Sequence, residues 1–380
     1  MLNPKTFCIL PFTRAVVRAD GSVGPCCYNN TVGNIRKENL LEYWNGTKLQ
    51  EIKADILNGK PYIQGCDGCY AHEEFLGTSM RIDSLNNNNF FSEKYYLKIF
   101  EHKKLNQLSF PNDIEMHVGN QCNLKCLTCK PQDSSKFLAE NKILKISNDK
   151  QSDFVFENNI LSTNLDLAFN YANQIDLRGG ESMLMPTIKN FLKKADHHKC
   201  QDKSLRLQTN GTVFDDEWAE IFKKFKSLEI MVSVDATGKA FEYIRYPGKW
   251  DVVVYNINQF KTVECKLYIN CTISNLNIII LNQLLEWSSR HNVHTHLTTA
   301  IEPEYYNVRN LPQKLIDQAE QHLNPWFNQY PLLKTMFQNL KSDTTQWKIF
   351  CEMINKRDKY RKNSIFDIIP QFKEYWNAQN

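Results

Sequence analysis

The stretch Cys122-Asn-Leu-Lys-Cys-Leu-Thr-Cys129 decides how this chain is interpreted. Its three cysteines, Cys122, Cys126 and Cys129, are separated by three residues and then by two, and they follow a strand-like segment at 113–118. Three thiolates on one short loop can bind three irons of a [4Fe–4S] cluster. Because no fourth cysteine follows close by, one iron stays open to a substrate or cofactor. A zinc site or three buried thiols are the alternatives.

The length and composition of the chain favour a cytoplasmic enzyme. Its 380 residues can form two domains and a large core. No early apolar run with a cleavage site and no apolar stretch of membrane-spanning length occurs, so we expect no membrane partner. The 12 cysteines fall largely in close pairs and triplets, which is typical of metal ligation in a reducing compartment. The net charge of +4 permits an acidic partner without requiring one.

Strand-like and helix-like segments alternate from about residue 113. The strand candidates are 114–118, 174–178, 204–209, 228–234, 263–273 and 293–299. Six strand–helix units predict a parallel (β/α)6 TIM-like barrel that is open because two units are missing. The functional side chains of such barrels lie at the C-terminal ends of the strands.

Three of these strand ends carry polar motifs. The second strand ends in Arg178-Gly-Gly-Glu-Ser182, where paired glycines let a ligand approach the backbone and Glu181 can accept hydrogen bonds from an ammonium group. The third ends in Gln208-Thr-Asn-Gly-Thr212, which by itself predicts only a turn. The fourth ends in Val232-Ser-Val-Asp235, and Arg245 lies in the helical segment that follows.

Together, the cysteine loop and these motifs resemble the radical S-adenosylmethionine (radical SAM) superfamily. The resemblance implies that Cys122, Cys126 and Cys129 bind the catalytic [4Fe–4S] cluster. It also implies that this cluster cleaves S-adenosyl-L-methionine (SAM) to a 5′-deoxyadenosyl radical, which abstracts hydrogen from a substrate. The residues implied to bind SAM are Gly179, Gly180, Glu181, Asn210, Ser233, Asp235 and Arg245.

The resemblance assigns these residues different parts of SAM. Glu181 occupies the position that holds the methionyl amine, Asn210 lies near the methionyl and ribose groups, and Ser233 with Asp235 faces the ribose hydroxyls and the carboxylate. Arg245 either pairs with the SAM carboxylate or is an ordinary solvated arginine. Three departures bear on the site: Ser182 replaces a proline, Leu127 replaces an aromatic residue that packs on adenine, and 269–274 lacks the usual adenine motif.

The N-terminal region contains a second set of cysteines. Ala15–Ala19 and Val23–Cys27 flank Asp20-Gly21, which predicts a β-hairpin. A helix is expected to begin at Thr47, which forms a capping box with Gln50. Four thiolates brought together by a hairpin and a helix can bind a [4Fe–4S] cluster or a structural zinc ion. They are Cys8, Cys26, Cys66 and Cys69, with Cys27 as the alternative to Cys26.

This cysteine pattern resembles the auxiliary-cluster domains called SPASM and, when truncated, twitch. The sequence around these cysteines also resembles such domains, in the stretches Cys8-Ile-Leu-Pro-Phe12, Pro25-Cys-Cys27 and Glu42-Tyr-Trp-Asn45. No further cysteine follows Cys69 until Cys122, so the truncated form with one auxiliary cluster fits better. Its place before the barrel is unusual, because such domains generally follow it.

We therefore expect four parts: a twitch-like iron–sulfur domain (1–77), a connector (78–112), a radical SAM barrel (113–310) and a helical C-terminal extension (311–380). Enzymes with auxiliary-cluster domains mostly modify peptides or proteins, and a flavodoxin or ferredoxin is a suitable electron donor. A nucleoside, sugar or RNA substrate is one alternative, although no arginine-rich strip indicates nucleic acid. A non-catalytic iron–sulfur scaffold is the other.

Overall fold

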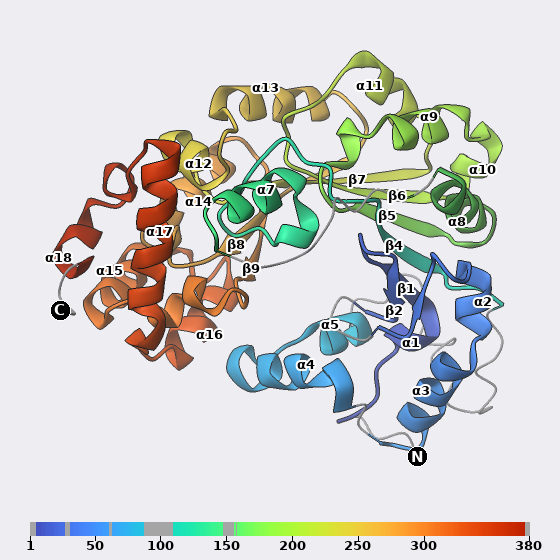
Figure 1. Cartoon of the computed structure of the whole chain (residues 1–380), viewed down its shortest axis with the longest axis horizontal. Coiled ribbons are helices and arrows are strands. Elements are labelled where there is room, and N and C mark those ends of the chain that lie inside the picture. The colour runs from blue at the N-terminus through green and yellow to red at the C-terminus, as the bar shows by residue number, and fades with distance from the viewer. Residues whose placement is uncertain are drawn as a thin grey trace.

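The computed structural model describes residues 5–26, 31–60, 63–86, 109–146, 156 and 158–376. In this part of the chain the strands form one sheet with the order β3-β2-β1-β4-β5-β6-β7-β8-β9 (Figure 1). They are β1 (Arg14–Val17), β2 (Ser22–Gly24), β3 (Gly33–Asn34), β4 (Asp113–His117), β5 (Gln174–Arg178), β6 (Ser204–Thr209), β7 (Ser227–Ser233), β8 (Lys266–Ile273) and β9 (His294–Thr299). Strands β4 to β9 pair in parallel in chain order. This confirms the predicted α/β fold with its mostly parallel sheet.

The six strands predicted from sequence correspond to β4 to β9. The largest difference is at β8, which begins at Lys266 rather than at 263. The preceding residues complete a turn instead, because the amides of Thr262 and Val263 donate to the carbonyls of Gln259 and Phe260. The end of the helix therefore continues into the region where the apolar pattern suggested a strand.

Alternation along the strands separates the two faces of the sheet. In β6, Leu205 and Leu207 are buried in the core, whereas Arg206 and Gln208 are partly exposed. Successive side chains of a strand point to opposite faces, so the apolar set faces the helices and the charged set faces the interior of the barrel. Residues of β4, β5, β6 and β9 line one cavity, so the sheet curls around this interior.

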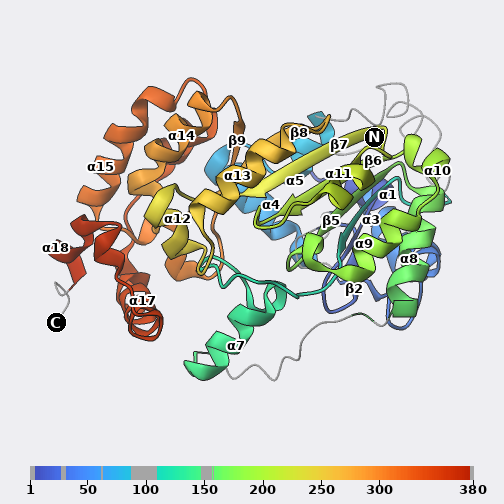
Figure 2. The same cartoon turned by 90° about the horizontal axis from the view of Figure 1, so that it is seen from above.

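Helices cover the outer face of the sheet (Figures 1 and 2). They are α8 (Asn158–Tyr171), α9 (Pro186–Lys194), α10 (His197–Gln201), α11 (Asp216–Phe222), α12 (Gly238–Ile244), α13 (Trp250–Phe260) and α14 (Leu281–Arg290). Helix α7 (Ser135–Ile143) instead projects away from the sheet, as Figure 2 shows. In α11, Trp218, Ile221 and Phe222 are buried, and the carboxylate of Asp215 accepts a hydrogen bond from the amide of Trp218 at 2.9 Å. Asp215 is thus the N-cap that fixes where this helix begins.

The N-terminal hairpin is part of the same sheet. Strand β1 pairs antiparallel with β2 and parallel with β4, so that Arg14 lies opposite Asp113. The helices of the N-terminal region are α1 (Leu10–Thr13), α2 (Leu40–Asn45), α3 (Thr47–Leu57), α4 (Ile63–Leu76) and α5 (Met80–Asn86). The predicted capping box at Thr47 is wrong, because Gly46 is the N-cap of α3 and no side chain caps it. The capping box lies before α2, between Asn39 and Glu42.

The C-terminal region is helical, as predicted. It comprises α15 (Gln313–Leu323), α16 (Pro331–Asn339), α17 (Trp347–Arg361) and α18 (Lys373–Trp376). Trp347 and Phe350 are buried, so aromatic residues of this region pack in the core, whereas Tyr360 is exposed. Helix α16 packs against α4, and Asn339 donates a hydrogen bond to the carbonyl of Phe75 at 2.6 Å. The C-terminal region therefore contacts the N-terminal region on the open side of the barrel.

Two features of the sequence analysis fall outside the described residues. Cys27 is one of them, and most of the connector, 87–108, is the other. Among the residues that are described, no helix combines the length and apolarity needed to cross a membrane.

Candidate active site

The loop that contains Cys122, Cys126 and Cys129 follows β4 at the C-terminal edge of the sheet. Main-chain hydrogen bonds anchor it to the end of α12: Lys125 N donates to Tyr246 O at 2.6 Å, and Leu127 N donates to Ile244 O at 2.8 Å. Both anchors lie between the cysteines that they position. The loop is thus held by backbone contacts and does not depend on the side chains of the intervening residues.

The three thiols of this loop lie close to one another. Burial raises the pKa of Cys126 to about 12, while Arg245 opposes this shift and Cys122 adds to it. The pKa of Cys129 is raised first by burial and then by Asp133, Cys126 and Cys122. A metal that binds these sulfurs must displace their protons, so its binding here depends strongly on pH.

Nitrogen donors surround two of the sulfurs. Leu124 N lies 3.4 Å from Cys122 Sγ, and Asn210 Nδ2 lies 3.9 Å from the same atom. Arg245 Nη1 lies 3.9 Å from Cys126 Sγ. Hydrogen bonds to ligand sulfurs tune the reduction potential of an iron–sulfur cluster, so these residues fit such a group.

The glycine pair after β5 packs directly against the start of the cysteine loop. A Cβ atom at Gly180 would lie 2.2 Å from the carbonyl oxygen of Gln121, and one at Gly179 would lie 2.7 Å from that of Gly119. The next amide, that of Glu181, donates to Gln121 O at 2.7 Å. The two glycines therefore let the loop after β5 pack against the start of the cysteine loop. The sequence alone indicates only that they let a ligand approach the backbone.

Glu181 is completely buried, and its carboxylate joins the second and third strand ends. It accepts hydrogen bonds from Asn210 N at 2.6 Å, Thr209 Oγ1 at 2.8 Å and Met183 N at 3.2 Å. Burial raises its pKa, and these three hydrogen bonds act in the opposite direction. The carboxylate is thus already engaged by protein donors, and its predicted contact with the methionyl amine stays a prediction.

The predicted Ser-x-Asp element lies at the end of β7. Asp235 forms an ion pair with Arg245, with 3.0 Å between Oδ2 and Nε, and its other oxygen accepts from Thr272 N at 3.0 Å. Ser233 Oγ accepts from Gln208 Nε2 at 3.3 Å. Arg245 is buried, so the solvated alternative is wrong, and its pairing with SAM stays a prediction. Arg245 instead links Asp235 to Cys126.

The structure also gathers the four N-terminal cysteines. The pKa of Cys8 is raised mainly by burial and further by Cys26, Cys66 and Cys69, which shows that all four lie within electrostatic range. Arg18 donates to the carbonyl of Cys26 at 3.0 Å. The hairpin, the segment before α1 and helix α4 therefore bring these cysteines near Cys8, and their role as ligands of one cluster stays a prediction.

Within the described ranges, no three His, Cys, Asp or Glu side chains are placed to hold one metal ion. A cubane cluster does not require such an arrangement, because each thiolate binds a different iron. A zinc ion requires four ligands that converge within about 2.3 Å of one point.

A cavity of about 810 Å³ borders the cysteine loop and was not predicted from sequence. Cys129 lines it together with charged residues that alternate along β4 and β5: Glu115, His117 and Arg178. His117 lies 2.9 Å from Glu115 and 3.6 Å from Asp133. The alternation Asp113-x-Glu-x-His117 is the signal that could have identified this lining, because alternate residues face the interior.

Comparison with known protein sequences gives two findings. Residues 8–70 match the SPASM family, described as an iron–sulfur cluster-binding domain. A cysteine-type anaerobic sulfatase-maturating enzyme from Clostridium novyi (strain NT) is 28% identical over 159 residues, which cover 38% of this chain and 39% of that protein. The resemblance to radical SAM proteins of the SPASM type is thereby confirmed.

Two solved structures are also similar to this chain. The anaerobic sulfatase-maturating enzyme anSMEcpe with bound AdoMet is 18% identical with a TM-score of 0.43, covering 58% of this chain and 62% of that one. Streptococcus suis SuiB bound to precursor peptide SuiA is 15% identical with a TM-score of 0.43, covering 70% and 60%. The chain thus spans well under half of its curated relative and about 60% of these structures.

Proposed function

We propose that this protein is a radical SAM enzyme that modifies a peptide or protein. Two [4Fe–4S] clusters would be bound, one by Cys122, Cys126 and Cys129 and the other by the N-terminal cysteines. When bound, the first cluster supplies the electron that converts SAM to a 5′-deoxyadenosyl radical able to abstract hydrogen. The observation that carries this proposal is the loop of three half-buried thiols, packed against the Gly-Gly-Glu motif and contacted by nitrogen donors.

The protein's own residues would position SAM and substrate. The cysteine loop, the Gly180 turn and the Asp235–Arg245 pair meet at the C-terminal edge of the sheet, where the SAM site is proposed. The adjoining cavity of about 810 Å³ would hold the reacting part of the substrate, beside Cys129. Closure of this cavity by a bound substrate would keep bulk water from a radical and so limit side reactions.

The peptide class is supported by the SPASM match and by the name of the Clostridium novyi relative, a sulfatase-maturating enzyme. The auxiliary cluster at Cys8, Cys26, Cys66 and Cys69 would accept an electron from the substrate or anchor it. We place the enzyme in the cytoplasm, with a flavodoxin or ferredoxin as donor, because free thiols and clusters require a reducing compartment. The division into 1–77, 78–112, 113–310 and 311–380 belongs to this proposal.

The test is SAM cleavage by the anaerobically reconstituted, dithionite-reduced protein. We expect slow formation of 5′-deoxyadenosine and methionine without substrate, and none when Cys122, Cys126 and Cys129 are changed together to Ala. Cys200→Ala is the matched control, because Cys200 is a buried thiol in the core. Absence of 5′-deoxyadenosine from wild-type protein with full iron content would support the scaffold alternative instead.

Glu181→Gln tests the position of SAM within this site. The substitution removes a charged acceptor, and a charge-assisted hydrogen bond contributes roughly 1.5–3 kcal/mol. We expect SAM to bind about tenfold more weakly, as measured by equilibrium dialysis with the folded variant. Unchanged affinity would remove Glu181 from the SAM site.

A further inference from the structure

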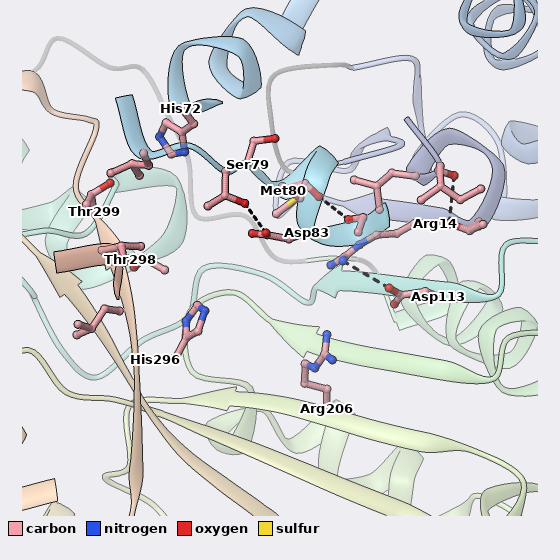
Figure 3. Close-up of a pocket in the computed structure, with 18 of the residues that line it drawn as sticks. Arg14, His72, Ser79, Met80, Asp83, Asp113, Arg206, His296, Thr298 and Thr299 are labelled. Atoms are coloured by element: carbon pink, nitrogen blue, oxygen red, sulfur yellow. Dashed lines mark hydrogen bonds and ion pairs between the residues drawn. The ribbon is translucent and has the colours of Figure 1, made fainter. Parts of the chain in front are cut away.

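A second cavity, of about 530 Å³, lies where the barrel meets the N-terminal helices. Figure 3 shows His296, Thr298 and Thr299 of β9 on one side of it, and Ser79, Met80 and Asp83 on the other. No residue of this cavity belongs to the SAM site proposed above. The cavity lies beside β9, which is the last strand in the sheet order, so one edge of this strand is free of a neighbouring strand among the described residues.

Four consecutive residues of β9 line this cavity: His296, Leu297, Thr298 and Thr299. Side chains of a strand alternate between the two faces, so a cavity on one face would contact only every second residue. A cavity that contacts consecutive residues must reach the edge of the strand, and this one also extends over the inner face of the sheet to Arg14 and Arg206. The main chain of β9 therefore borders this space.

The ladder between β8 and β9 shows which main-chain groups point there. Ala300 N donates to Ile273 O at 2.8 Å, and Thr298 lies opposite Thr272. In a parallel ladder, alternate residues bond to the same neighbour. The even-numbered residues of β9 thus bond to β8, and the N–H and C=O groups of Leu297 and Thr299 point away from β8.

These outward groups have no partner at this edge among the described residues. Thr295, the other outward residue of β9, contacts Tyr330 through hydrogen bonds. No hydrogen bond from a described residue reaches the main chain of Leu297 or Thr299 on the cavity side. The cavity consequently contains a short template of two donors and two acceptors at the spacing of a β-strand.

We propose that an extended segment of the peptide substrate binds in this cavity as an additional strand beside β9. This inference rests on the proposed function and deepens it. The occupant is a peptide main chain because strand addition satisfies the N–H and C=O groups of Leu297 and Thr299 together. Successive side chains of the peptide would point in opposite directions. One set would contact apolar residues of the cavity, including Leu76, Met80 and Leu332, and the other set would contact polar ones, including Asp83 and His296.

The position also gives the peptide a route to the cysteine loop. Ile301 lines the cavity beside β9, and the next residue, Glu302, lines the cavity beside Cys129. Lys130 of the cysteine loop forms an ion pair with Glu302 at 3.0 Å. A peptide that runs along β9 is thus directed toward the place where the radical would form.

The first experiment measures amide hydrogen exchange in segment 294–299 of the wild-type protein. The probe is a random-sequence pool of unstructured peptides, because recognition through the main chain tolerates most side chains. We expect the pool to protect the amides of Leu297 and Thr299, and a backbone N-methylated version of the same pool to leave them exchanging. Protection by both pools, or by neither, would overturn the strand proposal.

The second experiment compares Leu297→Pro with Leu297→Ala. Proline removes the N–H that points into the cavity and leaves the ladder to β8 intact, as edge strands permit. Alanine removes the same side chain and keeps the N–H. We expect Leu297→Pro to retain the peptide pool roughly three- to tenfold more weakly than Leu297→Ala, which corresponds to one main-chain hydrogen bond. Equal retention by the two folded variants would contradict the proposal.

These outcomes are independent of the proposed chemistry. Formation of 5′-deoxyadenosine by a protein that fails both peptide tests would leave the radical SAM function in place and remove the strand site. Peptide binding that depends on the main chain, in a protein that does not cleave SAM, would support the strand site and remove the radical SAM function.

Discussion

The guanidinium of Arg361 holds the main chain of the cysteine loop, since its Nη2 donates to the carbonyl oxygen of Lys125 at 2.6 Å. The same side chain also forms hydrogen bonds with the buried carboxylate of Glu140, as does Arg357. Lys125 lies between Cys122 and Cys126, so α17 holds the main chain that connects two of the thiols. The C-terminal extension is thereby coupled to the proposed cluster.

Arg361→Met tests this coupling, with Arg357→Met as the matched control. Each variant removes one of two arginines from Glu140, and each should lower the free energy of unfolding by about 1–3 kcal/mol. Only Arg361→Met also frees Lys125 O. We expect that variant alone to lose about half of its iron on gel filtration with a chelator, measured by metal analysis. Equal iron retention would show that the contact has no role in holding the cluster.

Gly180→Ala tests the approach of the two loops. Gly180 has φ of 50° and Gly238 has φ of 54°, so alanine is disfavoured equally at both, by roughly 1–2 kcal/mol. A Cβ at Gly180 would also collide with Gln121 O, whereas at Gly238 nothing lies within 4 Å. We therefore expect Gly180→Ala to lower both the melting temperature and iron binding, and Gly238→Ala to lower only the former. Similar losses in the two variants would contradict this explanation.

Much of this architecture was predictable from the chain. The six parallel strands followed from the alternation of short apolar segments with amphipathic helices, because both patterns are local. The proximity of Cys26, Cys66 and Cys69 to Cys8 agrees with the grouping expected from their types and spacing, although their role as ligands is untested. These features depend on residues close in sequence or on a known ligand set.

Other features depend on contacts between distant residues. The pairing of β1 with β4 joins residues about 100 positions apart, and the hairpin sequence alone does not identify this partner. Arg361 and Lys125 are likewise 236 positions apart. The capping box at Thr47 was wrong because the short helix α2 ends immediately before it and leaves Gly46 as the cap.

His117 should make stability depend on pH. Burial alone would lower its pKa, but hydrogen bonds with Asp133 and Glu115 more than reverse this effect and raise the pKa from 6.5 to about 9. Because the folded state favours the protonated ring, this stabilisation is complete below pH 6.5 and is lost as pH rises toward about 9. Its size is at most about 3 kcal/mol.

His117→Gln is the variant that measures this contribution. Wild type and variant should differ most in melting temperature below pH 6.5, and the difference should shrink as pH approaches about 9. Both proteins are compared in the same buffers with the same iron content. A difference that stays constant with pH would mean that His117 is not charged in the folded state.

The two cysteine groups should bind iron independently. We expect about eight irons per chain in the reconstituted wild type, and about four when Cys122, Cys126 and Cys129 are changed to Ala. Cys66→Ala with Cys69→Ala should also leave about four, because these residues lie on α4, apart from the cysteine loop. This double variant should still cleave SAM and fail to form product. If it folds and retains the barrel cluster but loses SAM cleavage, the two groups do not act separately. Zinc at Cys66 and Cys69 in the wild type would instead show that the N-terminal site is structural.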